Sequence, residues 1–406
     1  MRRRDFLRGT ALVPGVVAGF GASAGVKPKV RAITAFVALD RARYQAQIQD
    51  TLKMLGSARR VVEHAGYQVE GVRITTQPFA EYTRGLSRDD SRRFFREYIE
   101  LATKEGFAAN IGPARVGDIE LLGEILSEGR APNASLIIAD ENGIHWDGVR
   151  AAAKVIQFVA EHSPGSAGNF NFAATAMLEP YAPFFPGSNH VGSGRRFSIG
   201  TEGANVVDQV FAETAGNTPL AIERLTSVIG EHATALEKAA KLIEKETGWA
   251  YMGIDATPAP LGDVSIGAAI EKFTGAKFGS AGTMTAAAVI TRAVQAAPVK
   301  RVGYSGLMVP VMEDKLLAQR WSEGTYGVDA VLAYSAVCGT GLDTIPLAGD
   351  VSQQQIERIL GDVASLAFKW KKPLSARLLP CKGKKAGERT SFEDPFLINT
   401  LIRAVP

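Results

Sequence analysis

The chain has few of the residues and motifs that identify a chemistry. Its 406 residues include two cysteines and five histidines. Two cysteines cannot build a disulfide framework, and the histidines form neither an HExxH motif nor another short metal-ligand spacing. No GxSxG, no P-loop and no GxGxxG after a first strand is present. The sequence therefore names no cofactor and no substrate.

The only candidate membrane segment is too short to be an anchor. The uncharged stretch from Gly9 to Gly21 is interrupted by Pro14 and by four glycines. It is far shorter than the roughly 20 apolar residues that a bilayer-spanning helix needs. We therefore expect no permanent membrane anchor.

The same N-terminal region reads as an export signal. The order of residues from Arg3 to Arg8 resembles the twin-arginine consensus, and Ala22 to Ala24 supply a small-residue cleavage site. A disordered basic terminus is the alternative. We predict that residues 1–24 are a signal peptide, so that the twin-arginine export machinery carries the folded chain to a periplasmic or extracellular location.

The charge balance implies no basic binding surface. Residues 1–24 hold four arginines and one aspartate, so the net charge of +4 falls to +1 without them. A nearly neutral chain has no electrostatic footprint for nucleic acid or for an anionic membrane. With 46% apolar residues, the remainder is long enough to bury a large core.

Apolar runs of strand length alternate with segments of helical periodicity along the rest of the chain, as in βα units. We count about ten strands and predict one α/β domain over residues 26–406, because no low-complexity linker interrupts the series. The clearest strands are expected at 30–39, 69–75, 108–111, 135–140, 169–178, 196–200, 250–255, 331–337 and 375–379. The segment 179–194, rich in Phe and Pro, is expected to be an ordered loop at the site.

The stretch from Arg301 to Asp350 carries the strongest candidates. Val331 to Val337 is an apolar run of strand length, and Cys338 follows it directly before a Gly-rich turn. A thiol there would look out of the end of a sheet, where many α/β enzymes keep their chemistry. Cys338 is therefore a candidate nucleophile or acid/base; a buried inert thiol and a disulfide with Cys381 are the alternatives.

His190 is the histidine that we single out, because it lies in the aromatic loop. It is a candidate general base, and a hydrogen bond to the backbone is the bland alternative. Asp255, Glu313, Asp314 and Asp343 are candidate carboxylates. Their ordinary roles would be helix caps and turns, and as a set they could instead hold a divalent cation.

Six segments together resemble the uncharacterised bacterial and archaeal family called domain of unknown function 711. They occur in the same order as in that family and cover nearly all of the mature chain: 63–79, 168–177 with the PFFPGSNH that follows, 253–260, 305–314, 337–343 and 377–388. The resemblance implies a ten-stranded α/β barrel similar to that of pyruvate formate-lyase and other glycyl radical enzymes. It implies no activity, because a fold does not transfer a function.

The residues argue against a glycyl radical. Arg301 to Tyr304 lack one residue of the glycyl radical motif and precede Cys338 instead of following it. The expected function is therefore that of an exported protein of unknown activity; if it is an enzyme, its chemistry is polar, with Cys338, His190, Asp255 and Glu313 acting inside the barrel.

The alternative is a non-catalytic protein that binds a small molecule or a metal. Its ligand-binding residues would come from Asn169, Asn171, Asp314 and Asp343, which the resemblance places around the same cavity. The sequence leaves open both a small-molecule ligand and a homo-oligomer.

Overall fold

The computed structural model describes residues 25–405. The predicted signal peptide, residues 1–24, lies outside this range. Within the described range, no helix combines the length and the hydropathy needed to cross a bilayer.

Ten strands form one mixed sheet, which confirms the ten-stranded α/β architecture expected from the sequence. The strands are β1 Lys29–Val37, β2 Val72–Thr76, β3 Ala108–Ala114, β4 Asn133–Asp140, β5 Gly143–Ile144, β6 Phe172–Ala176, β7 Arg195–Glu202, β8 Ala250–Asp255, β9 Gly341–Ala348 and β10 Leu374–Cys381. Their order is β8-β7-β1-β2-β3-β4-β6-β10-β9, with β5 paired to β4.

Strand direction divides the sheet into three parts. The central strands β1, β2, β3, β4 and β6 are mutually parallel. The flanking pairs β7–β8 and β9–β10 are each parallel, but they meet the central group through antiparallel contacts, β1 with β7 and β6 with β10. The amino-terminal ends of the five central strands therefore lie together along one edge.

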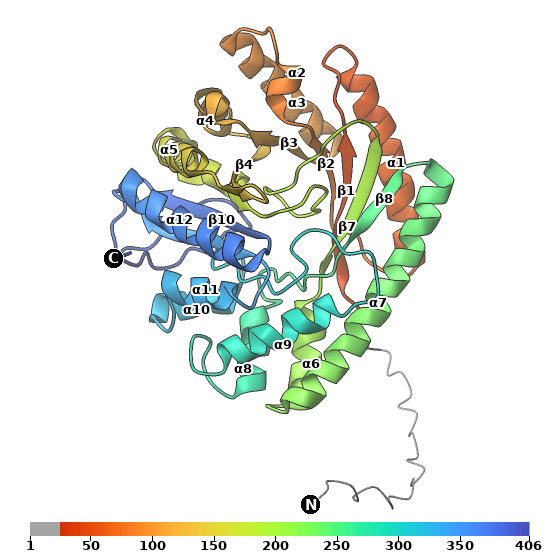
Figure 1. Cartoon of the computed structure of the whole chain (residues 1–406), viewed down its shortest axis with the longest axis vertical. Coiled ribbons are helices and arrows are strands. Elements are labelled where there is room, and N and C mark those ends of the chain that lie inside the picture. Colours follow the sequence, from red (N-terminus) through yellow and green to blue (C-terminus); the bar gives the residue numbers. More distant parts are fainter. Residues whose placement is uncertain (1–24, 406) are drawn as a thin grey trace, which may run out of the picture.

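Helices surround the sheet on the outside (Figure 1). They are α1 Tyr44–His64, α2 Phe79–Tyr82, α3 Arg88–Glu105, α4 Ile119–Leu126, α5 Trp146–His162, α6 Ala204–Thr214, α7 Thr218–Thr247, α8 Ile266–Thr274, α9 Thr283–Gln295, α10 Lys315–Glu323, α11 Val328–Ser335 and α12 Gln353–Trp370, with short 3-10 segments at Val116–Asp118 and Pro164–Asn171. The main core fills the space between this helical layer and the sheet, and it contains alternate residues of β1 such as Ile33 and Ala35.

An irregular segment, residues 300–311, links the two edge strands of the sheet. At one end, the amide of Ile254 in β8 donates to Lys300 O (2.8 Å), and Val302 N donates back to Ile254 O (3.2 Å). At the other end, Val311 N donates to Asp343 O in β9 (3.0 Å). This linking segment spans the gap between β8 and β9, which the described residues do not pair directly.

The loop between β6 and β7 lies against the inner face of the sheet. Thr34 of β1 donates to Pro183 O (2.9 Å), Thr75 of β2 bonds the Ser188 hydroxyl (2.8 Å), and Asn110 of β3 donates to Pro186 O (2.7 Å). Three polar side chains on three adjacent strands therefore hold the Phe- and Pro-rich loop inside the sheet. Ordinary packing of the strands would leave those positions apolar.

One predicted strand is a helix. Val331 to Val337 belongs largely to α11, and the strand β9 begins after Cys338 instead of before it. The buried residues of α11 include Val331, Tyr334 and Ser335, which follow the i, i+3, i+4 spacing of a helix. Cys338 therefore lies between a helix and a strand and not at the end of a strand.

Candidate functional site

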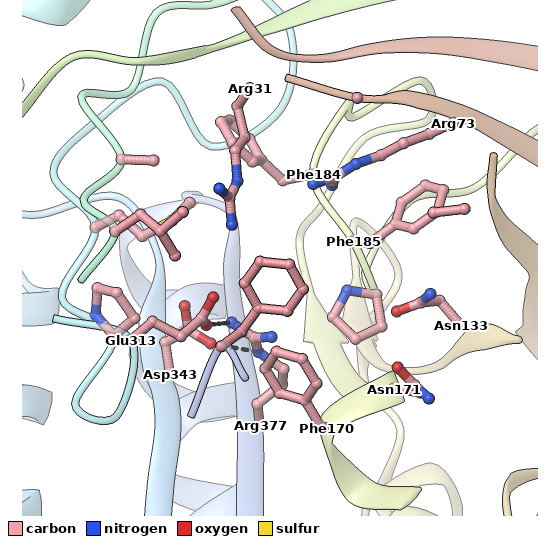
Figure 2. Close-up of a pocket in the computed structure, with 18 of the residues that line it drawn as sticks. Arg31, Arg73, Asn133, Phe170, Asn171, Phe184, Phe185, Glu313, Asp343 and Arg377 are labelled. Atoms are coloured by element: carbon pink, nitrogen blue, oxygen red, sulfur yellow. Dashed lines mark hydrogen bonds and ion pairs between the residues drawn. The ribbon is translucent and has the colours of Figure 1, made fainter. Parts of the chain in front are cut away.

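A cavity of about 630 Å³ lies at the amino-terminal edge of the five central strands. Its lining includes Arg31 near the start of β1, Arg73 in β2, Asn133 in β4 and Asn171 just before β6. The opposite wall comes from the linking segment, β9 and β10, and the loop residues 184–186 complete the lining (Figure 2). The α/β proteins usually bind ligands at the carboxyl ends of their strands, and this cavity lies at the opposite edge.

Arg377 and two carboxylates form a buried ion cluster on one wall. The Nε of Arg377 donates to Asp343 Oδ1 at 2.6 Å, and its terminal nitrogen pairs with Glu313. The guanidinium also lies over the Phe170 ring, 5.0 Å from its centroid. Burial alone would lower the pKa of Arg377, but the two carboxylates outweigh it and raise that pKa. Arg377 is therefore a fixed cation that orients both acids.

Glu313 combines a shifted pKa with a position on the cavity wall. Burial raises the pKa of Glu313, and the neighbouring Arg377 opposes that rise only in part. Glu313 lines the cavity and only about 8% of its surface is exposed. A buried carboxyl with a raised pKa beside an open volume has the properties of a general acid or base.

A second cluster surrounds Arg31 at the top of the cavity. One nitrogen of Arg31 contacts both Glu70 Oε2 (3.1 Å) and Glu202 Oε2 (3.0 Å), and Lys29 adds a further contact to Glu70 (2.9 Å). Burial first, and then Glu70, raise the pKa of Glu202 to about 7. Arg31 and Lys29 therefore already share two carboxyl groups as partners.

Arg73 differs from the other two arginines. Within the described part of the chain, no carboxylate lies within ion-pair distance of its guanidinium. Its recorded contacts are a long hydrogen bond to Pro183 O (3.4 Å) and the face of the Phe185 ring, 4.9 Å from the centroid. Burial first, and then the nearby Arg31, lower the pKa of Arg73 to about 9. Arg73 therefore remains a cation at neutral pH and lacks an anion.

Two asparagines complete the wall below Arg73. Asn133 donates its amide NH₂ to Ala109 O (3.2 Å), and Asn171 donates to Ala131 O (3.4 Å). Figure 2 shows both carbonyl oxygens turned toward the cavity. The wall therefore offers two hydrogen-bond acceptors to a cavity that Pro186 also lines.

Three of the eight residues predicted from the sequence line this cavity: Glu313, Asp343 and Asn171. Asp314 is the N-cap of α10, and its carboxylate also accepts from Ser265 Oγ (2.6 Å) and Ile266 N (2.7 Å) at the start of α8. Asn169 donates to Ile156 O (2.8 Å) behind the 3-10 segment. Asp314 and Asn169 therefore have contacts typical of structural roles.

Asp255 also lies outside the cavity lining. Its carboxylate accepts hydrogen bonds from Thr257, from Tyr304 N (2.7 Å) and from Ser305 N (3.0 Å). The last two donors belong to the linking segment, where a Cβ on Gly303 would come within 2.3 Å of the same carboxylate. Asp255 thus binds the linking segment to the end of β8.

His190 and Cys338 are both enclosed. His190 is fully buried near the rings of Phe36 and Tyr181, and its ring nitrogens have no partner among the described residues. Burial lowers the pKa of His190 to about 4. Cys338 is 1% exposed within the apolar core, it forms no disulfide, and burial raises its thiol pKa. Neither His190 nor Cys338 therefore lines the cavity beside Glu313.

Sequence reasoning missed Arg31, Arg73 and Arg377. Each is the one arginine of a mostly buried strand, in the segments KVRAITAFV, VRITT and LSARLLPC. A buried strand seldom holds an arginine without a partner, so this pattern was the available signal. No group of three or more His, Cys, Asp or Glu side chains within residues 25–405 is arranged to hold a metal ion.

Comparison with known proteins places most of the chain in one family. The family model described as Uncharacterised ACR (DUF711) matches residues 25–393. A UPF0210 protein of Pyrobaculum aerophilum is 31% identical over 365 residues, covering 83% of this chain and 79% of its own length. A UPF0210 protein of Syntrophobacter fumaroxidans is 27% identical over 401 residues and covers 89% and 88%.

Solved structures that this fold is similar to include two anaerobic ribonucleotide reductases. One gives a TM-score of 0.40 and covers 86% of this chain and 70% of that chain. The other, from Thermotoga maritima in complex with dATP and CTP, gives a TM-score of 0.42 and covers 86% and 75%. Both are 9% identical in sequence. On the family match and its relatives, the chain belongs to the DUF711 family, also called UPF0210.

Proposed function

We propose that this chain binds a small organic anion in the cavity, with Arg73 as its principal contact. The observation that carries the proposal is that Arg73 is a partly buried cation with no carboxylate partner in the described structure, while Arg31 and Arg377 each hold two. A buried charge without a counter-ion is costly, and an anionic ligand would remove that cost.

The surroundings of Arg73 fit a carboxylate or a phosphate group. A guanidinium presents a planar fork of N–H donors that matches both groups. Phe185 supports one face of the guanidinium, and Phe170 and Phe184 supply apolar walls for the rest of the ligand. A volume of about 630 Å³ is within the range of ordinary small-molecule sites.

The test compares Arg73→Gln with Arg60→Gln in the full chain. Arg60 is exposed on α1 and serves as a matched loss of one positive charge. Inorganic phosphate and hexanoate are titrated calorimetrically, and native mass spectrometry looks for a co-purified anion. We expect Arg73→Gln to weaken binding at least about tenfold, the equivalent of one charged hydrogen bond, and Arg60→Gln to leave it unchanged. Equal binding by both variants would remove the proposal.

A second function, acid–base catalysis on the bound anion, is supported by Glu313. It combines a raised pKa with a place on the cavity wall and a fixed orientation by Arg377. This role needs neither Cys338 nor His190. The Asp255 carboxylate lies against Gly303, the residue that a glycyl radical would require, so the arrangement favours polar proton transfer over radical chemistry. Once a substrate is known, Glu313→Gln should keep binding and lose turnover. A variant that keeps full turnover would exclude Glu313 as the acid or base.

We also propose that residues 1–24 direct export through the twin-arginine route. The proposal is supported by the order of Arg3, Arg4, Phe6 and Leu7 and by the small residues up to Ala24. That route carries folded proteins, so a ligand could be bound before export.

A further inference from the structure

Asn133 and Asn171, in the wall below Arg73, indicate which groups the rest of the ligand must have. This inference rests on the anion-binding function proposed above. Asn133 and Asn171 each use their NH₂ group on a backbone carbonyl, that of Ala109 and that of Ala131. These bonds fix the orientation of both amides. Both carbonyl oxygens therefore face the cavity (Figure 2) and await donors.

The groups that meet these oxygens must be donors and need not be charged. Of the acids that line the cavity, Glu313 and Asp343 pair with Arg377 and Glu70 pairs with Arg31, while Asp394 accepts the backbone N–H of Phe396 on the side of Arg31. A site built for an ammonium group would place a free carboxylate here instead of two neutral amides. Neutral acceptors beside apolar rings fit hydroxyl groups on a carbon chain.

The register of the strands places Arg73 and Asn133 at the same edge of the sheet. Arg73 pairs with Ala108 on β3, and Asn110 of β3 pairs with Asn133 on β4. Two strand spacings and two residue steps place the Cα atoms of Arg73 and Asn133 roughly 12 Å apart. Both side chains line the same cavity, so one small ligand can reach the guanidinium and the amide together.

We propose that the ligand is a hydroxylated short-chain anion, such as a sugar acid. Its anionic group binds the guanidinium of Arg73. Its hydroxyl groups donate to the Oδ1 atoms of Asn133 and Asn171, and its C–H face packs against Phe170 and Phe185.

The experiment titrates the full chain with three aldonates (D-gluconate, D-galactonate and D-mannonate), with hexanoate and with 6-aminohexanoate. We expect at least one aldonate to bind about tenfold or more tightly than hexanoate, since a site with unpaired acceptors rejects a ligand that lacks the donors. The doubly substituted Asn133→Ala/Asn171→Ala chain should lose this preference and keep hexanoate binding. Asn142→Ala, an exposed asparagine, is the control.

The outcomes separate the two proposals. If hexanoate binds in an Arg73-dependent way but no aldonate binds more tightly, the hydroxylated ligand is excluded and anion binding stands. If 6-aminohexanoate binds most tightly, the neutral oxygens receive an ammonium group and the inference is wrong. If no anion binds in an Arg73-dependent way, the anion-binding function itself fails. Asn171→Asp, which keeps an acceptor oxygen, should retain part of the preference, and full loss would count against the inference even where the double variant folds poorly.

Discussion

The Asp255 carboxylate accepts from backbone N–H groups of two separate segments, Thr257 and the linking segment at Tyr304 and Ser305. Asp255→Asn would put an NH₂ group against some of these donors, leaving buried groups unpaired. We expect the free energy of unfolding to fall by about 2 to 4 kcal/mol, measured by urea denaturation.

The matched control is Asp263→Asn, whose side chain is 84% exposed and pairs with Lys315 at the surface. That change should cost less than about 0.5 kcal/mol. If the two variants were equally stable, Asp255 would not hold the linking segment.

Glu202 makes the stability of the fold depend on pH. Its pKa is raised from 4.5 to about 7 by burial and by Glu70. A carboxyl group with a raised pKa in the folded state contributes stability below its ordinary pKa and loses that contribution as the pH rises through 7. The free energy of unfolding should therefore fall between about pH 5 and pH 8.

Glu202→Gln resembles the protonated acid and should flatten this pH dependence by about 1 to 2 kcal/mol, because the lowered pKa of Glu70 offsets part of the effect. Urea denaturation of both chains at four pH values is the measurement. Parallel stability curves for the two chains would contradict the assignment to Glu202.

At the residue scale, the sequence identified the acids of the cavity more readily than its cations. Glu313 and Asp343 follow segments that contain Gly or Pro, which predict a turn or loop, and a carboxylate in such a place is a recognisable site candidate. Arg73 and Arg377 lie within mostly buried strands, and the alternation of side chains along a strand does not tell which of its faces lines a cavity. Cys338 was a candidate because a thiol can be reactive, but its burial depends on tertiary packing, which the sequence alone does not show.

At the scale of elements, the linking segment depends on close backbone packing. A Cβ on Gly306 would lie 2.8 Å from the Cα of Gly339, on the loop that also carries Cys338. Gly306→Ala must push these two backbones apart, so we expect a loss of about 1 to 3 kcal/mol in the free energy of unfolding.

Gly117→Ala is the control for this change, since a Cβ there meets no atom within 4 Å. It should change stability by less than about 0.5 kcal/mol. Urea denaturation of both variants distinguishes the cases, and a Gly306→Ala chain as stable as the Gly117→Ala chain would show that the loops can separate freely.

Strand and helix were confused where an element is short. The eight residues of α11 are apolar enough to pass for a buried strand, and length alone could not decide. In contrast β9 contains Gly341, Asp343 and Pro346, which argue against a strand in a sequence. It forms because its neighbour β10 supplies the ladder, and that pairing joins residues far apart in the chain.

At the scale of the whole molecule, the alternation of strands and helices was enough to predict a ten-stranded α/β fold. The order of the strands was not predictable, because β7 and β10 join the central group in the antiparallel sense. This reversal puts β10 and its Arg377 beside the amino-terminal edge of the central strands. The place of the cavity follows from that topology and not from any single motif.

Export is also a property of the whole molecule. Replacing both Arg3 and Arg4 by Lys keeps the charge and removes the twin-arginine pair. We expect the exported fraction to fall strongly, and the protein released by the unaltered chain to begin at Gly25. Immunoblots of cell fractions and N-terminal sequencing are the measurements, and an unchanged yield outside the cytoplasm would refute this route.

The shared cap at Asp314 joins the interior of the molecule to its exterior. Its carboxylate caps the N-termini of both α8 and α10. It accepts from the backbone N–H groups of Ile266 and Gly267 in α8 and of Leu316 and Leu317 in α10. Glu313, on the cavity wall, is the preceding residue. Because Glu313 and Asp314 share a peptide bond, a backbone shift at Glu313 would also move the cap that holds both helix N-termini.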